Sequence, residues 1–150
     1  MRVILVVLIA GAFLLTGIPV IAATDKKKKL AQGVAHAEGF GEPGAIPTLA
    51  HNPGDLELGD KYGLGLLGEG ITVMPDDVTG WSELERITEL WLAGKSHVVL
   101  LDDSFLTIGH SYVDGPNTPT VSQDALNWGR NVADFLGVNV TMTLRQWRDS

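Results

Sequence analysis

The chain has 150 residues, of which 45% are hydrophobic and 19% are charged. A chain of this length and composition can bury a core of its own, which excludes a largely disordered protein. It contains no cysteine, so disulfide scaffolds, iron–sulfur clusters, thiolate zinc sites and cysteine nucleophiles are excluded. Its net charge of −7 argues against nucleic acid as a partner, because binding a phosphate backbone requires a basic surface.

The first part of the chain is a long apolar segment. Residues 3–23 carry no charge, follow Met1-Arg2 and end in small residues, a pattern typical of a secretory signal. The segment is also long enough to span a bilayer, which takes about 20 apolar residues. We therefore expect residues 1–23 to be a signal peptide or signal-anchor. The protein would then be periplasmic or extracellular, with membrane association through residues 3–23 if the segment is retained.

A lysine-rich linker is expected over residues 24–29, ahead of a single domain over residues 30–150. The cluster Lys26–Lys29 would prefer the cytoplasmic side of a membrane, which leaves open an anchored protein that faces the cytoplasm. From residue 30 onward, six Lys and Arg residues face seventeen Asp and Glu residues, a net charge of −11. An acidic domain after an export signal fits an extracytoplasmic protein.

The first predicted element of the domain is a helix over residues 30–38, with Leu30, Val34 and Ala37 on one face. Residues 39–54 hold four glycines and three prolines and predict an irregular loop. Residues 55–58 and 71–74 are short β-leaning runs separated by glycines, which predicts a small hairpin.

Helices are predicted for the rest of the chain. Thr79 is the expected N-cap of a helix that turns Trp81, Leu84 and Trp91 inward and stops at Gly94. Later helices are predicted by the same signals at Ser104 (through Tyr112), at Ser122 (ending at Gly137) and near Thr143. The expected fold class is α+β and mostly helical, with a small β-hairpin.

A glycine motif and the four histidines do not predict a cofactor or metal site. Residues 63–68 match G-x-G-x-x-G, but they lack the buried strand before and the helix after that a dinucleotide site needs, so they predict a hairpin tip. The four histidines show no metal-ligand spacing. No cofactor and no metal are therefore expected.

Glu38 is the candidate for acid–base chemistry. It stands at the end of an apolar helix and precedes Gly39-Phe40, so its carboxyl lies beside nonpolar surface. Desolvation raises the pKa of such a carboxyl, which suits a general acid near neutral pH.

Three stretches of the chain resemble a known family. The run from Ala35 through Glu38-Gly39-Phe40, then Ile46-Pro47-Thr48, and then His51-Asn52-Pro53-Gly54-Asp55-Leu56 resemble the lysozyme-like domains of bacteria and phages. In that family, E-G-[FY] at a helix end precedes a loop ending N-N-P-G-[ND]-L. Further matches follow in order at Gly80-Trp81, at Tyr112 and at residues 128–137, so the resemblance covers residues 30–147.

The resemblance implies a lysozyme-like helical body and cleavage of the β-1,4 bond between N-acetylmuramic acid and N-acetylglucosamine. Glu38 would be the general acid, with Asp55 as the best candidate for a second catalytic carboxyl. The residues expected to contact the saccharide are His51, Asn52, Tyr112 and Asn131. His51 departs from the family, which usually carries an asparagine there.

The predicted function is thus a peptidoglycan-cleaving glycosidase, either a muramidase or a lytic transglycosylase, with peptidoglycan glycan strands as the partner. Because no second carboxyl stands at a fixed spacing, transglycosylation is slightly preferred. The alternative is a catalytically inactive lysozyme-like module that binds glycan or has a structural role. The acidic charge favours that alternative, since peptidoglycan is itself polyanionic.

Overall fold

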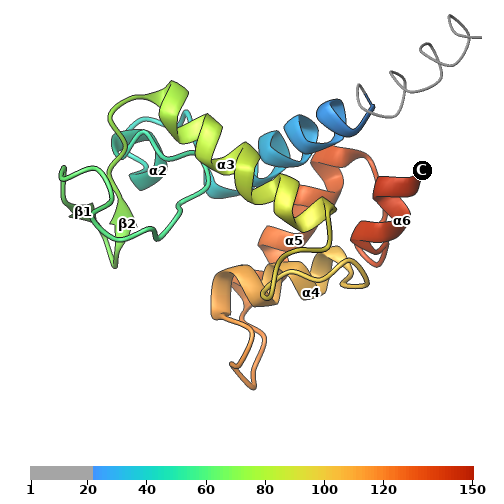
Figure 1. Cartoon of the computed structure of the whole chain (residues 1–150). Helices are drawn as coiled ribbons and strands as arrows, with labels where there is room; N and C mark the ends of the chain where they lie inside the picture. Colours follow the sequence, from blue (N-terminus) through green and yellow to red (C-terminus); the bar gives the residue numbers. More distant parts are fainter. Residues whose placement is uncertain (1–21) are drawn as a thin grey trace, which may run out of the picture.

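The computed structural model describes residues 22–150, which are mostly helical with one small antiparallel hairpin (Figure 1). A first helix, the N-terminal helix, covers residues 22–38. The elements after it are α2 (Ile46–Leu49), β1 (Leu66–Leu67), β2 (Ile71–Thr72), α3 (Asp77–Leu92), α4 (Phe105–Gly109), the π-helix η1 (His110–Asp114), α5 (Gln123–Leu136) and α6 (Leu144–Asp149). The expected mostly helical α+β class is confirmed.

The expected export or anchor segment lies almost wholly outside the described residues. Only residues 22 and 23 of it are described, and both are helical. Among residues 22–150, every helix is too short or too polar to cross a bilayer. The lysines of residues 24–29, expected in a linker, lie within the N-terminal helix.

The N-terminal helix packs into the body of the domain. Leu30 and Val34 are buried one turn apart, as the apolar spacing predicts. Its close neighbour is α5, because a Cβ added to Gly33 would lie 3.4 Å from a Phe135 ring carbon. The backbone carbonyl of Lys27 accepts a hydrogen bond from Thr88 of α3. The helix is therefore held from both sides, between α3 and α5 (Figure 1).

The helix α3 begins earlier than the sequence predicted. Its N-cap is Asp76, whose side chain accepts a 2.7 Å hydrogen bond from the Thr79 backbone N–H. Thr79, the expected N-cap, is instead the third residue of the helix. The helix ends as predicted, since Gly94 takes a left-handed φ of 69° directly after the C-cap.

The later helices begin at the expected residues. Ser104, Ser122 and Thr143 are N-caps whose side chains accept backbone hydrogen bonds, and Gly137 ends α5 in the left-handed conformation. The helix expected from Ser104 through Tyr112 is α-helical only to Gly109 and continues as η1.

The close contact of α4 with α5 depends on two glycines. A Cβ on Gly109 would lie 2.4 Å from the Ala125 carbonyl oxygen, and a Cβ on Gly129 would lie 2.5 Å from the Phe105 carbonyl oxygen. The two backbones therefore touch, and no larger residue fits at either position. This contact fixes η1 and the middle of α5 relative to each other.

The hairpin differs from the prediction in its first strand. Leu66 pairs with Thr72 and Leu67 with Ile71, so residues 66–67, at the end of the glycine-rich stretch, form β1. Residues 55–58 were expected as that strand, and this expectation is wrong. They still run beside β2, because the Thr72 N–H donates to the Leu56 carbonyl at 3.1 Å. The loop over residues 39–54 is irregular except for α2.

Candidate active site

Glu38 is the last residue of the N-terminal helix, and the chain reverses directly after it. The Gly39 N–H donates to the His36 carbonyl, and the Phe40 N–H donates to the Ala35 carbonyl. This pair of bonds is a Schellman motif, which needs a left-handed residue after the C-cap, and Gly39 supplies it with a φ of 77°. The sequence Glu-Gly-Phe thus ends the helix with the Glu38 carboxyl at its final turn.

Asn52 folds the loop that carries Asp55. Its side chain donates to the carbonyls of Leu56 and Thr72 and accepts from the Leu56 N–H, each at 2.9 Å. Asn52 is fully buried, and these three bonds use both ends of its amide. It was expected to line the saccharide cleft, but it lies inside the loop and links residues 52–56 to β2.

The same loop meets α3 at Gly80. A Cβ on Gly80 would lie 2.0 Å from the His51 carbonyl oxygen, so only glycine permits this approach. The His51 ring lies 2.7 Å from Asp77 at the start of α3 and is about half exposed. His51 therefore contacts α3 and not the Glu38 carboxyl.

The loop brings Asp55 against Glu38, so the two expected catalytic carboxyls are neighbours. Their side chains lie within hydrogen-bonding reach of each other, and such a bond requires a proton on one of the two. Asp55 Oδ1 is buried, and no donor of the described chain reaches it. Asp55 also has a left-handed φ of 50°, an uncommon conformation for a residue other than glycine.

Both carboxyls have raised pKa values. Burial raises the pKa of Glu38 to about 7; the hydrogen bond from Trp128 opposes this rise, and the negative charge of Asp55 adds to it. Burial also raises the pKa of Asp55, while its hydrogen bond with Glu38 lowers it. With a pKa of about 7, Glu38 is still partly protonated near neutral pH, where an ordinary glutamate is ionised.

Glu38 also contacts a stack of aromatic side chains through Trp128. The indole N–H of Trp128 donates to Glu38 Oε1 at 2.6 Å. Tyr112 stacks on Trp128 with ring centroids 4.8 Å apart, and Trp91 meets Tyr112 edge-on. The Tyr112 hydroxyl, expected to contact substrate, donates to the Gly54 carbonyl. Tyr112 therefore ties η1 to the Asp55 loop.

A pocket of about 290 Å³ opens beside Glu38. It is lined by Ala37, Glu38, Val113, Asp124, Asn127, Trp128 and Asn131. Asn131 was expected at the site. Asp124 and Asn127 were not, although their spacing to Asn131 on a predicted helix places all three on one face.

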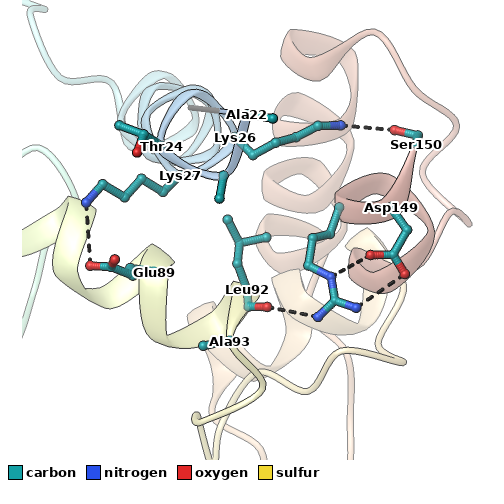
Figure 2. Close-up of a pocket in the computed structure, with 11 residues that line it drawn as sticks. Ala22, Thr24, Lys26, Lys27, Glu89, Leu92, Ala93, Asp149 and Ser150 are labelled. Carbon is teal, nitrogen blue, oxygen red and sulfur yellow. Dashed lines mark hydrogen bonds and ion pairs between the residues drawn. The ribbon is translucent and has the colours of Figure 1, made fainter. Parts of the chain in front are cut away.

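A larger cavity, about 650 Å³, lies at the opposite end of the N-terminal helix (Figure 2). Ala22 lines this cavity, and the 16 residue steps from Ala22 to Glu38 rise by about 24 Å in a helix. Four of its charged groups form ion pairs, Lys27 with Glu89 at 3.5 Å and Arg148 with Asp149 at 2.7 Å, and Lys26 donates a hydrogen bond to the Trp147 carbonyl. The hydrogen bond from Arg148 lowers the pKa of Asp149 at this cavity.

Within residues 22–150, no three His, Asp or Glu side chains are grouped as metal ligands. Comparisons of the chain with protein-family models, curated proteins and solved structures find no match.

Proposed function

We propose that the protein is a glycosidase of lysozyme-like fold that cleaves the β-1,4 bond between N-acetylmuramic acid and N-acetylglucosamine in peptidoglycan, with Glu38 as the general acid. The observation that carries the proposal is the buried Glu38 carboxyl beside Asp55. Burial, to which the negative charge of Asp55 adds, raises the pKa of Glu38 to about 7, so Glu38 still binds a proton near neutral pH, where an isolated glutamate has lost it. The Trp128 indole and the end of the N-terminal helix hold the carboxyl beside an open pocket.

Asp55 acts as the charged partner of Glu38. Its negative charge helps to keep the proton on Glu38 before the reaction and stabilises the positive charge that develops on the sugar ring when the glycosidic bond breaks. Tyr112 and Asn52 do not touch the substrate in this proposal. They hold the loop that keeps Asp55 in place.

The contact between the carboxyls supports lytic transglycosylation over hydrolysis. Two-carboxylate hydrolases keep these groups about 5–5.5 Å or 6.5–9.5 Å apart, and the wider spacing admits a water. Groups that share a hydrogen bond are closer than either. In transglycosylation Glu38 donates its proton to the glycosidic oxygen and the bond from C1 to that oxygen breaks. The 6-hydroxyl of the same sugar then bonds to C1 and returns its proton to Glu38.

Residues 1–23 complete the proposal as an export segment that brings the domain to the cell wall. A fusion of the chain to a periplasmic reporter tests this part. Reporter activity only in the cytoplasm would contradict it and would favour an anchored protein that faces the cytoplasm.

The substitution Glu38→Gln tests the assignment of the acid. We expect purified cell wall to be cleaved about 10²–10⁴-fold more slowly, because the amide keeps the shape of the carboxyl but cannot protonate the leaving oxygen. Glu42→Gln, in the exposed loop four residues later, is the matched control and should keep full activity. Equal activity of Glu38→Gln and the wild type would reject the assignment, as would loss of activity in Glu42→Gln alone.

Mass spectrometry of the released fragments identifies the reaction. Anhydro-muramic acid ends are expected from the wild type, because the substrate supplies its own nucleophile. Reducing muramic acid ends that disappear in Asp55→Asn would instead show a hydrolase in which Asp55 directs a water.

A further inference from the structure

We propose that His110 is a positioning residue that holds one wall of the pocket beside Glu38, and that it does so only while its ring carries two protons. This wall comprises Val113 of η1 and Asp124 of α5, which both line the pocket. The consequence for catalysis rests on the proposed function. The contacts of His110 themselves do not depend on what the pocket binds.

A short loop joins the two parts of this wall. Residues 115–121, the wall loop, begin after η1 and end at Ser122, the N-cap of α5; they project from the domain between α4 and α5 (Figure 1). None of the seven residues of the wall loop is buried, so apolar packing does not hold it in place. Its position therefore depends on hydrogen bonds.

His110 makes two of these bonds. Its ring Nδ1 lies 3.0 Å from Asp114 Oδ2 in η1, and its Nε2 lies 2.9 Å from the Thr118 carbonyl oxygen in the wall loop. These two bonds are the His110 clamp. The Thr118 hydroxyl also donates to the Asp114 carbonyl, and Asp114 Oδ2 accepts from the Ser122 N–H at 2.9 Å. The clamp thus links η1, the wall loop and the start of α5.

Both ring nitrogens of His110 face oxygens that accept hydrogen bonds. The Thr118 carbonyl has no proton to donate. Hydrogen bonds from Ser122, and then the one from His110, lower the pKa of Asp114, so its carboxyl is ionised near neutral pH. A neutral imidazole has one N–H and one lone pair, so it satisfies one of these acceptors and turns its lone pair toward the other. The imidazolium donates to both, and the geometry is therefore that of the ring with two protons.

The surroundings of His110 favour the charged ring. The side chains of His110 and Asp114 are 18% and 11% exposed, so water replaces a lost bond only in part. Of the elements beside η1, α4 and the wall loop carry no charged residue. The helix α5 approaches Gly109, the residue before His110, through Ala125. The charged residue next to Ala125 is Asp124, which is acidic like Asp114.

Loss of the second proton releases the wall loop. Histidine side chains change charge between about pH 5 and 8, so the clamp holds at low pH and is lost as the pH rises through this range. The end of η1 is then no longer tied to α5, and Val113 no longer stays at a fixed place opposite Asp124. Glu38 also holds its proton on the acid side of pH 7. The acid and the pocket wall are therefore in place over the same pH range.

Amide hydrogen exchange of the full chain tests the clamp without a substrate. The readout is the protection of the Thr118 and Ser122 amides relative to an unstructured peptide at the same pH, with amides in the middle of α5 as the reference for global unfolding. We expect this protection to fall about tenfold or more from pH 5 to pH 8, because hydrogen bonds to charged groups are the stronger ones. His110→Gln should lack the protection at both pH values. His97→Gln replaces an exposed histidine after α3 and is the matched control.

The charge of Asp114 is tested by a conservative variant. In Asp114→Asn the amide oxygen can still accept from the ring, but it no longer stabilises the imidazolium by its charge. The loss of wall-loop protection should therefore come about one pH unit lower than in the wild type. Nitrogen-15 NMR of the His110 ring measures its protonation directly, and we expect both ring nitrogens to carry a proton at pH 5.

Wall cleavage tests the coupling of the clamp to the pocket. At pH 5 the kcat/KM of His110→Gln should be about 2–12-fold below that of the wild type, the factor expected from one net hydrogen bond. At pH 8 the two proteins should converge, because the clamp is then lost in both. A loss of the same size at both pH values would show a purely structural residue and would overturn the proposal.

Equal protection of the wall loop at pH 5 and pH 8 would also overturn the proposal, as would a single ring proton on His110 at pH 5. These two outcomes do not depend on cleavage. If Glu38→Gln still cleaves wall but the wall-loop protection falls with pH as expected, the clamp stands and the proposed general acid fails. If Glu38→Gln is inactive but the wall loop does not respond to pH, the proposed function stands and the clamp fails.

Discussion

The two ends of the N-terminal helix differ in the state of the charged groups beside them. At the residue 22 end, a cavity of about 650 Å³ is bordered by Lys27 paired with Glu89 and by Arg148 paired with Asp149 (Figure 2). At the Glu38 end, a cavity of about 290 Å³ adjoins two carboxyls within hydrogen-bonding reach of each other. The larger cavity is bordered by ion pairs whose acidic partners are more than half exposed, and such pairs contribute little energy. The smaller one holds groups whose protonation the fold has altered, and such groups are typical of active sites.

The largest effect should come from the approach of the Asp55 loop to α3. Gly80→Ala places a Cβ 2.0 Å from a backbone oxygen, which no side-chain rotation relieves, so we expect a loss of about 3 kcal/mol or more in the free energy of unfolding. Wall cleavage should fall with it, because Asp55 moves with the loop. Chemical denaturation measures the first effect and a zymogram the second.

Gly33→Ala is the control for that substitution. The added methyl meets its nearest neighbour at 3.4 Å, and Ala is favoured over Gly within a helix by about 0.5–1 kcal/mol. Its stability should be unchanged or raised. Equal stability of the two alanine variants would show that the loop does not depend on Gly80.

The next effect concerns the pH dependence of stability. Because the pKa of Glu38 is raised from 4.5 to about 7, the folded protein binds more protons than the unfolded chain between these values, and stability falls as pH rises through them. Gln cannot ionise, so Glu38→Gln does not lose stability as the pH rises. The variant should be more stable than the wild type by about 2–3 kcal/mol above pH 7 and about equally stable at pH 4. Urea unfolding at both pH values checks this; a Glu38→Gln variant less stable at pH 8 would contradict it.

A smaller effect is expected at Trp128. In Trp128→Phe the stack on Tyr112 can persist but the hydrogen bond to Glu38 is lost, so the pKa of Glu38 should rise and the alkaline limb of the activity profile should move to higher pH. The rate at the optimum should fall about tenfold, since a hydrogen bond that orients the acid contributes about 1 kcal/mol or more. Trp147→Phe, at the other end of the molecule, loses packing against Phe105 but should leave the pH profile in place. An unshifted alkaline limb in Trp128→Phe would count against the role of the indole.

The smallest effect should come from the residue 22 end. Glu89→Gln breaks the ion pair with Lys27, in which the Glu89 side chain is 61% exposed. Exposed pairs contribute about 0.2–1 kcal/mol, so the variant should unfold within about 0.5 kcal/mol of the wild type and cleave wall normally. A clear loss of wall cleavage in Glu89→Gln would show that the residue 22 end of the helix also contributes to function.

Sequence reasoning succeeded where a few neighbouring residues decide the outcome. Ser122, Thr143 and Gly137 were predicted as helix ends because capping bonds join residues three or four apart. The N-cap of α3 was predicted at Thr79, three residues too late, because Asp76 can also cap this helix and does so in the structure. Sequence reasoning also failed for residues 55–58, which lie beside β2 through a single backbone hydrogen bond, whereas residues 66–67 form the strand that pairs with it.

For the candidate site, the sequence alone indicated Glu38 through its place at a helix end, and the adjacent Gly39 determined how that helix stops. Only the tertiary structure decided that Asp55 meets Glu38, that Asn52 and Tyr112 are turned inward, and that α5 supplies the pocket wall. The reason is physical. A turn depends on bonds between near neighbours, whereas the desolvation that raises a carboxyl pKa depends on side chains up to 90 positions away in the chain, as Trp128 is from Glu38.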